Sequence, residues 1–390
     1  MTIGSRSGAE VGLDARPRRL GVGQWFDGLR LHRGDIELTG DLITAVGLPA
    51  GGDGIACPGY IDLQINGFRG TDALTTDVHG VATIASQLPA TGVVAFALTL
   101  ITAEVDDIDR SLAHITDVRA AQRAEHLRTG ARLLGAHLEG PFLSRAFPGA
   151  HPVELLRDAD AGLVNHWIST GALVMVTMAP EISGGLDAVD AFSSNGIVVS
   201  LGHCDATGLQ ANAAFDRGAR ALTHGLNAHR LLSARDPGPL GVALTRADIV
   251  TTVIADGVHL DSANLLLLQR AAPGRIALVT DGIAASGLGD GVFQYGPLTV
   301  TVTEGRATVP SGRLAGSVAT MDSSVRLAAA CWGVEAALAA ATSIPAELLG
   351  RPDLGRLGVG ETGDLVILND RLDVLRTLCA GQTLYEVADA

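Results

Sequence analysis

The sequence predicts an α/β fold, a (β/α)8 barrel of TIM type, together with a small β-sandwich formed by the N- and C-terminal segments. Eight apolar runs rich in β-branched residues follow one another along the chain, and segments of helical length separate most of them. Strands that are apolar along their whole length indicate a parallel sheet whose outer face is covered. Eight such repeats favour a closed barrel over an open doubly wound sheet, which is the alternative.

The pattern places the predicted strands and helices along the chain. The eight strand-like runs are 60–66, 93–100, 132–138, 173–179, 197–203, 220–224, 249–255 and 276–280. The helical segments between them include 78–88, 152–169, 206–217 and 261–271. The barrel is therefore expected to span residues 58–358.

The flanking segments have a different pattern. Residues 19–57 and 359–390 contain short, Gly-rich stretches in which apolar and polar residues alternate, as in 35–39 and 364–368. Such alternation is typical of half-buried strands, so the two segments are expected to form the sandwich together. Residues 1–18 carry no periodic pattern, and we expect them to be poorly ordered.

Composition narrows the class of protein. The chain of 390 residues has a formal net charge of -14 and no long basic run, so no nucleic-acid partner is expected. Its four cysteines are scattered without a CxxC pair, which fits reduced thiols in a cytoplasmic protein. The N-terminus lacks the apolar stretch of a signal peptide. The most apolar helical stretch, 325–342, contains Arg326 and Glu335, so we expect a packed helix and no membrane partner.

Residues of the types that bind metals follow three of the predicted strands. Glu139 lies just after the third run, in the segment HLEGPF, while His203 and His224 end the fifth and sixth runs. Two imidazoles and one carboxylate are the ligands of a catalytic zinc site that keeps one position open for water. We therefore expect one divalent metal ion per chain. Zn²⁺ is the first choice and Fe²⁺, Mn²⁺ or Co²⁺ are the alternatives, because mixed nitrogen and oxygen ligands select weakly among them.

Further polar groups lie at the ends of other predicted strands. Gln64 and Asn66 close the first run, Asp256 and His259 follow the seventh, and Asp281 follows the eighth. Since barrel enzymes carry their chemistry at the carboxyl ends of the strands, these side chains are expected to share a site with the metal ligands. Asp281 is the candidate general base, which takes a proton from the attacking water and returns it to the leaving group. The alternative is that Asp281 caps a helix, but no helical pattern begins directly after it.

Through these residues the chain resembles the N-acetylglucosamine-6-phosphate deacetylases of the amidohydrolase superfamily. The resemblance rests on the segments PGYIDLQING (58–67), HLEGPF (137–142), GAH (149–151), GH (202–203), TH (223–224), NA (227–228), IADGVH (254–259), VTD (279–281) and LAGS (314–317). HLEGPF is the most specific of them. The resemblance implies a metal-dependent enzyme of amino-sugar catabolism or cell-wall recycling. Such an enzyme hydrolyses the acetamide of N-acetyl-D-glucosamine 6-phosphate to D-glucosamine 6-phosphate and acetate.

The resemblance also implies roles for individual residues. Many amidohydrolases carry His-x-His at the end of the first strand and hold two metals. Gln64 and Asn66 stand there in this chain, which implies a single metal, with Gln64 contacting the bound water. His151 is implied as a catalytic residue that polarises the acetamido carbonyl and stabilises the oxyanion. The residues implied in binding the amino-sugar phosphate are Gln64, Ala150, His151, Asn227, Ala228, Arg235, Asp256, His259, Leu314, Ala315 and Gly316. Arg235 and His259 would hold the phosphate, and Arg235 would do so in the neighbouring subunit of a homodimer.

The segment 225–229 departs from the family pattern. The family usually has Leu-Phe before the position of Asn227 and a Met two residues after it, whereas this chain has Gly225, Leu226 and His229 at these places. A change of a few methylenes in a pocket wall alters discrimination by about 1–3 kcal/mol, so the sugar epimer and the N-acyl group stay open. The alternatives are a deacetylase of N-acetyl-D-galactosamine 6-phosphate or of another N-acyl-hexosamine 6-phosphate, a cyclic-amide hydrolase, and a non-catalytic sugar-phosphate binder.

Overall fold

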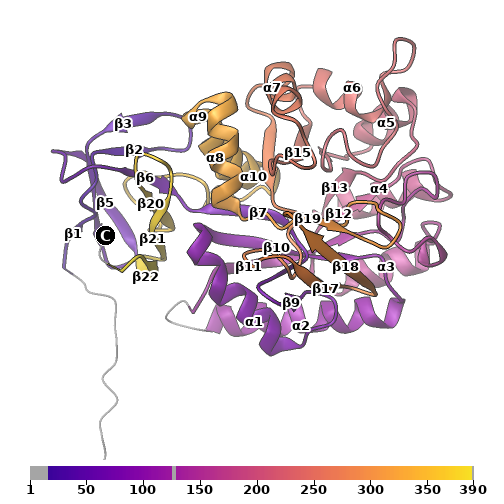
Figure 1. The fold of residues 1–390 in the computed structure, drawn as a ribbon, viewed down its shortest axis with the longest axis horizontal. Coiled ribbons are helices and arrows are strands. Elements are labelled where there is room, and N and C mark those ends of the chain that lie inside the picture. Colours follow the sequence, from indigo (N-terminus) through magenta and orange to yellow (C-terminus); the bar gives the residue numbers. More distant parts are fainter. Residues whose placement is uncertain (1–15, 125–128, 389–390) are drawn as a thin grey trace, which may run out of the picture.

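The centre of the molecule is a barrel of eight parallel strands (Figure 1), seen in a computed structural model that describes residues 16–124 and 129–388. The strands are neighbours in chain order: β7 (Tyr60–Ile65), β10 (Val93–Ile101), β11 (Arg132–Glu139), β12 (Leu173–Met178), β13 (Val198–Leu201), β14 (Ala221–Leu222), β15 (Val250–Ile254) and β16 (Ile276–Val279). The backbone N–H of Asp281 donates to the Gln64 carbonyl over 2.8 Å, and that of Asn66 donates to the Gly282 carbonyl over 2.7 Å. These two bonds join the last strand to the first, and the predicted (β/α)8 fold is confirmed.

The apolar composition of the strands follows from their position between the barrel interior and the surrounding helices. All nine residues of β10, with the sequence VVAFALTLI, are buried. A strand of an antiparallel sheet with one wet face would instead alternate polar and apolar residues. Polar and apolar residues therefore do not alternate in β10, as expected for a strand that is covered on both faces.

Helices surround the barrel, and four of them begin with a side-chain cap (Figure 1). They are α1 (Val78–Gln87), α2 (Val105–Ala124), α3 (Ala161–Ser169), α4 (Gly185–Ser194), α5 (Gly208–Asp216), α6 (Gly238–Thr245) and α7 (Ser262–Ala271). The side chains of Asp77, Asp160, Thr207 and Asp261 each accept a hydrogen bond from a backbone N–H of the first turn. These caps satisfy backbone N–H groups that have no partner inside the helix, and so they help to set where α1, α3, α5 and α7 begin.

Two of the predicted helical stretches differ in the structure. In the stretch 152–169, a short 3-10 turn (Val153–Leu155) is followed by α3, which begins only at Ala161 because Asp160 caps it. The stretch 325–342 is not one helix. It divides into α8 (Met321–Trp332) and α9 (Val334–Ala341) at Gly333, whose φ of 88° cannot continue a helix, and α10 (Ser343–Leu348) follows. Within the described residues no helix is long and apolar enough to cross a membrane.

A small antiparallel sheet follows the eighth barrel strand, and the sequence pattern described above does not predict it. It consists of β17 (Gly291–Tyr295), β18 (Leu298–Thr303) and β19 (Arg306–Thr308). Its inner face forms an apolar cluster with Ile101 at the end of β10 and with Ile283 after β16. A two-stranded hairpin of β8 (Gly67–Phe68) and β9 (Thr71–Asp72) follows the first barrel strand. Both additions lie at the end of the barrel where its strands terminate.

The two terminal segments form further sheets to one side of the barrel (Figure 1). One sheet contains β1 (Arg18–Arg19), β4 (Asp35–Thr39) and β5 (Leu42–Leu48), and the other runs in the order β22 (Gln382–Glu386), β21 (Val374–Cys379), β20 (Leu365–Leu368), β6 (Ile55–Pro58), β2 (Gln24–Phe26), β3 (Leu31–Arg33). Apolar residues of both sheets, such as Ile36 and Leu378, share one core. The domain boundaries stay a prediction. The segment 1–18 was expected to be poorly ordered. Its residues 1–15 lie outside the described part of the chain, and Arg18 at its end belongs to β1.

Candidate active site

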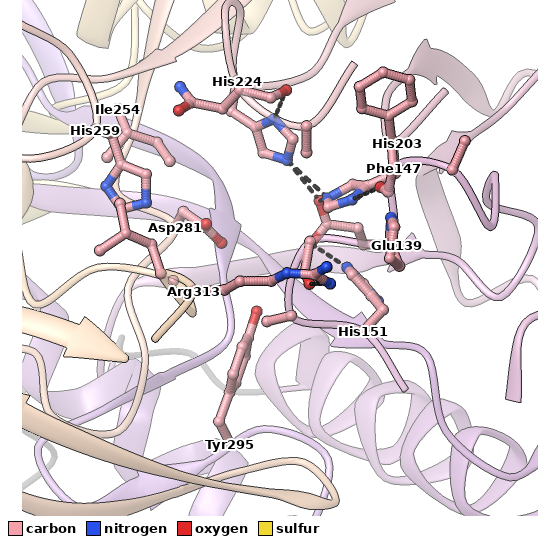
Figure 2. Close-up of a pocket in the computed structure, with 18 residues that line it drawn as sticks. Glu139, Phe147, His151, His203, His224, Ile254, His259, Asp281, Tyr295 and Arg313 are labelled. Carbon is pink, nitrogen blue, oxygen red and sulfur yellow. Dashed lines mark hydrogen bonds and ion pairs between the residues drawn. The ribbon is translucent and has the colours of Figure 1, made fainter. Parts of the chain in front are cut away.

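The predicted metal ligands and the predicted base lie together at the carboxyl ends of barrel strands, where they line a cavity of about 420 Å³ (Figure 2). Glu139 is the last residue of β11, whereas His203, His224 and Asp281 follow β13, β14 and β16. These last three residues have left-handed backbone, with φ of 47°, 34° and 48°. That conformation is unfavourable for a residue with a side chain and clusters at functional sites. The surrounding fold therefore imposes the direction of these side chains against a local cost.

Three donor atoms converge at the spacing of a metal site. Oε1 of Glu139 lies 3.4 Å from Nε2 of His203 and 3.1 Å from Nε2 of His224, and the two Nε2 atoms are 3.1 Å apart. Ligand atoms placed tetrahedrally at 2.0–2.1 Å from one zinc ion lie about 3.3 Å from each other. The three side chains thus fit a divalent metal. Glu139, His151 and His203 also come within 4.8 Å of one another, so distance alone leaves two candidate ligand sets.

The partners of the ring nitrogens decide between the two sets. Nδ1 of His203 lies 3.0 Å from the Phe147 carbonyl, and Nδ1 of His224 lies 3.2 Å from the Asn227 carbonyl. A carbonyl only accepts hydrogen bonds, so both rings carry their proton on Nδ1 and present the Nε2 lone pair to the cavity. A metal-binding imidazole usually has its other nitrogen held in this way.

His151 has the opposite arrangement. The backbone N–H of Thr102 donates to its Nδ1 over 3.3 Å, and the Thr102 hydroxyl lies 2.9 Å from the same atom. Since an N–H group can only donate, Nδ1 is an acceptor and the proton is on Nε2. Burial, with a smaller effect from His203, lowers the pKa of His151 to about 3, so the ring is neutral. Its Nε2–H is 3.9 Å from Oε2 of Glu139. A protonated nitrogen cannot bind a metal but can donate to a substrate oxygen, which favours Glu139, His203 and His224 as the ligands.

Asp281 lies across the cavity from His203 (Figure 2) and is held by two amides. Its Oδ1 accepts from Nδ2 of Asn66 over 2.7 Å and from Nε2 of Gln64 over 3.2 Å. The same Gln64 nitrogen lies 3.1 Å from Oε1 of Glu139. Gln64 therefore joins the base to the ligand carboxylate.

The two carboxyl groups have pKa values shifted in opposite directions. Burial opposes the charge on Glu139, but a proton on Nε2 of His203 or His224, in the place that a metal ion would take, holds the pKa of Glu139 well below its usual range. Burial, reinforced by the nearby charge of Glu139, raises the pKa of Asp281. Paired groups with separated pKa values are typical of sites in which one group stays charged while the other exchanges a proton. The arrangement suits metal-assisted hydrolysis with Asp281 as the acid and base.

Comparison with known proteins agrees with this chemistry. Residues 55–384 match the amidohydrolase family. Curated N-acetylglucosamine-6-phosphate deacetylases of Bacillus subtilis and Homo sapiens are 34% and 39% identical over 347 and 357 residues, which is 87% of this chain and 86% or 85% of those proteins. The chain belongs to the N-acetylglucosamine-6-phosphate deacetylases of the amidohydrolase family. It is therefore an enzyme of a metal-dependent family.

Solved structures of this deacetylase family share the whole fold. A Mycobacterium smegmatis mutant deacetylase in complex with N-acetyl-D-glucosamine-6-phosphate superposes with a TM-score of 0.88 at 32% identity, covering 94% of this chain and 99% of that one. The Thermotoga maritima deacetylase gives a TM-score of 0.87 at 27% identity over 95% and 100% of the two chains. The terminal sheets are thus shared as well as the barrel.

Most of the residues expected to bind the amino-sugar phosphate line the cavity. They are Ala150, His151, Asn227, Ala228, His259, Leu314 and Gly316. His259 has its Nδ1 2.8 Å from Oδ2 of Asp256, and Oδ1 of Asp256 accepts from the backbone N–H groups of Val258 and His259. Asp256 itself does not line the cavity. Asp256 thus contacts His259 and not the cavity, and its expected part in substrate binding stays a prediction.

Three further residues expected at the site do not line the cavity of their own chain, and their roles stay predictions. Gln64 is only 1% exposed and does not line the cavity, and its amide nitrogen donates to Glu139 and Asp281. Ala315 lies in the apolar cluster of the small sheet, and its N–H donates to the Ala307 carbonyl. Arg235 is exposed on the loop before α6 and does not line the cavity of its own chain.

The segment 225–229 also differs from the expected pocket wall, since neither Gly225 nor His229 lines the cavity. A Cβ on Gly225 would lie 2.6 Å from Cγ2 of Thr251, so Thr251 occupies the space of a larger residue. Nε2 of His229 accepts from the N–H of Leu226 over 2.9 Å, and its Nδ1 is 3.1 Å from the Arg230 carbonyl. Leu226 and Ala228 have φ of 73° and 50°. His229 thus holds a strained turn that carries Asn227 and Ala228.

Seven residues that line the cavity are absent from the site residues expected from the sequence: Ala146, Phe147, Pro148, Gly149, Ile254, Tyr295 and Arg313. Nη1 of Arg313 donates to the Gly149 carbonyl over 3.2 Å and so links the segments on two sides of the cavity. Arg313 directly precedes the Leu314–Gly316 segment, and this position next to expected site residues could have indicated that Arg313 lies at the site. Tyr295 lies on a sheet that the sequence pattern does not predict.

Proposed function

We propose that the protein hydrolyses N-acetyl-D-glucosamine 6-phosphate to D-glucosamine 6-phosphate and acetate, with one divalent metal held by Glu139, His203 and His224. The convergence of these three donor atoms beside Asp281 carries the proposal. Zn²⁺ is the metal we expect. A metal at this position polarises the substrate carbonyl and makes a water molecule more acidic.

Asp281 moves the proton in this reaction. It takes one proton from the water as the water oxygen attacks the acetamide carbon. It then gives that proton to the amide nitrogen as the carbon–nitrogen bond breaks, which releases the amine and leaves acetate. Asn66 and Gln64 occupy Oδ1 of Asp281, so Oδ2 is the oxygen that exchanges the proton.

His151 stabilises the developing charge on the carbonyl oxygen. Its Nε2–H faces the cavity beside Glu139 because Nδ1 is bound by Thr102. A neutral donor aimed at an oxyanion in a buried site contributes strongly to the rate, since the donor is already oriented.

The phosphate binds at the side of the cavity where His259 and Asn227 lie. His259 is oriented by Asp256, and the turn of Asn227 and Ala228 supplies main-chain groups. Arg235 is exposed on its own chain, which supports a homodimer in which it reaches the neighbouring site. A guanidinium is suited to phosphate by its planar set of donors. The enzyme is expected in the cytoplasm.

Acetate release from N-acetyl-D-glucosamine 6-phosphate tests this proposal. Purified, metal-loaded wild-type enzyme should release acetate, and Asp281→Asn should reduce turnover by at least about 10²–10⁴-fold while the metal content stays unchanged. Asp370→Asn, the same chemical change at an exposed site in the terminal sheets, is the matched control and should not alter turnover. Absence of acetate with the wild type would reject the substrate, and near-normal turnover in Asp281→Asn would reject Asp281 as the base.

A further inference from the structure

The phenol of Tyr295 is a polar group of the cavity that the mechanism above does not use. Tyr295 is the last residue of β17, its side chain is only 4% exposed, and it lines the cavity. No described residue forms a hydrogen bond with its hydroxyl group. The hydroxyl oxygen remains accessible from the cavity. A substrate that displaces the cavity water must offer this hydroxyl group a partner or leave it unsatisfied, which is unfavourable.

The tyrosine ring is fixed by its surroundings. It packs in the apolar cluster with Ile101, Ile283 and Val300. The turn after it is anchored as well, because the N–H of Gly296 donates to Oδ2 of Asp72 over 2.8 Å. The hydroxyl is thus held in place before any substrate binds, so little side-chain entropy is lost when it forms a hydrogen bond.

The position of the hydroxyl group indicates which part of the substrate it meets. Figure 2 shows Tyr295 pointing into the cavity from the side where His151 and Arg313 lie, away from His259 and Ile254. His151 faces the acyl carbonyl in the proposed function, and His259 faces the phosphate. The phenol therefore lies at the end of the cavity that receives the N-acyl group.

The phenol is a donor in this environment. Burial, followed by the negative charges of Asp281 and Glu139, raises the pKa of Tyr295 far above its usual value. The hydroxyl thus keeps its proton. An acetyl methyl group offers it no acceptor, whereas an acyl chain with its own hydroxyl group does.

We propose that Tyr295 selects the N-acyl group and that the site prefers a hydroxyacetyl group to an apolar acyl group of the same size. This inference rests on the proposed deacetylase function and narrows its substrate class. The phenol donates to the hydroxyl oxygen of the acyl chain while the carbonyl is held by His151. A propionyl group has similar volume but leaves the phenol without a partner, and sites built to bind a hydroxyl group discriminate against analogues that lack it.

The test compares glucosamine 6-phosphate carrying N-acetyl, N-hydroxyacetyl or N-propionyl groups. We expect the wild type to show a higher kcat/KM for the hydroxyacetyl than for the propionyl substrate. Tyr295→Phe should lower that ratio roughly five- to tenfold, the effect of one hydrogen bond. Tyr60→Phe is the matched control, because the hydroxyl of Tyr60 likewise has no hydrogen-bond partner among the described residues, but it is buried at the start of β7 and does not face the cavity. It should leave the ratio unchanged.

The outcomes separate this inference from the function on which it rests. If a folded Tyr295→Phe variant kept the same ratio of kcat/KM for the hydroxyacetyl and propionyl substrates, Tyr295 would not select the N-acyl group. An equal fall for all three substrates would also overturn this selection, since the phenol would then bind the sugar. If the wild type released no amine from any of the three substrates, the deacetylase function itself would be wrong.

Discussion

Nδ2 of Asn66 lies 2.7 Å from Oδ1 of Asp281 and is the shortest contact made by that carboxyl group. Asn66 stands where many amidohydrolases carry the second histidine of a metal-binding pair. In this chain it orients the base. Asn66→Ala should lower kcat about 10–100-fold with little change in KM, because groups that orient the reacting residues have effects of this size. Metal content measured on the same preparation should be unchanged. A kcat equal to that of the wild type would show that Asp281 needs no such support.

The turn at 225–229 should depend on His229. His229→Met removes the acceptor for the Leu226 N–H and the donor to the Arg230 carbonyl. Since the turn carries Asn227 and Ala228, we expect KM for the sugar phosphate to rise about tenfold, the value of one to two hydrogen bonds, with a smaller change in kcat. His229→Gln can still accept from Leu226 and should restore part of the loss. If KM rose in neither variant, the turn would keep its shape without the hydrogen bonds of His229.

Asp62 should make stability depend on pH in an unusual direction. Burial raises its pKa to about 6, against hydrogen bonds from Thr280 and Gln64 that favour the charged form. The folded protein then binds this proton more tightly than the unfolded chain. The free energy of unfolding falls as pH rises from about 4 to about 6, and about 3 kcal/mol of it is lost above that window.

Asp62→Asn removes this titration. Chemical denaturation at several pH values should show the variant gaining stability relative to the wild type between pH 4 and 7. A difference between the two proteins that is constant over this range would contradict the raised pKa. Comparing the two at each pH cancels the contribution of every other titrating group.

Metal removal should destabilise the protein as well as inactivate it. A ligand that binds only the folded state stabilises it, by about 2.7 kcal/mol at a hundredfold excess over Kd. Chelation should therefore lower Tm, and adding back Zn²⁺ should restore both Tm and acetate release. Loss of activity with an unchanged Tm would argue that the metal is held weakly or elsewhere.

The barrel and most of the site could be predicted because the two follow from one pattern. Strands covered on both faces are apolar throughout, as β10 is, and the carboxyl ends of parallel strands share one face. Glu139, His203, His224 and Asp281 could therefore be assigned to a common site from their positions after such runs. Their chemistry then follows from the residue types alone.

What the sequence could not give is the direction of individual side chains and the contacts between distant segments. Gln64 sits at a strand end like the others, yet its amide nitrogen is bound to two carboxylates. Tyr295 reaches the cavity from a small sheet whose turn at Gly296 is bound to Asp72, far away in the sequence. The tautomer of His151 depends on a backbone N–H from Thr102. None of these contacts leaves a periodic signal in the chain.

The central claim is that Glu139, His203 and His224 bind the metal while His151 donates a hydrogen bond. Elemental analysis of washed His151→Gln and His224→Gln proteins tests it most directly, with acetate release measured alongside. We predict that His151→Gln keeps about one metal per chain and loses most of its turnover, whereas His224→Gln loses the metal. The opposite result, with metal lost from His151→Gln and kept in His224→Gln, would contradict this assignment of ligands and donor.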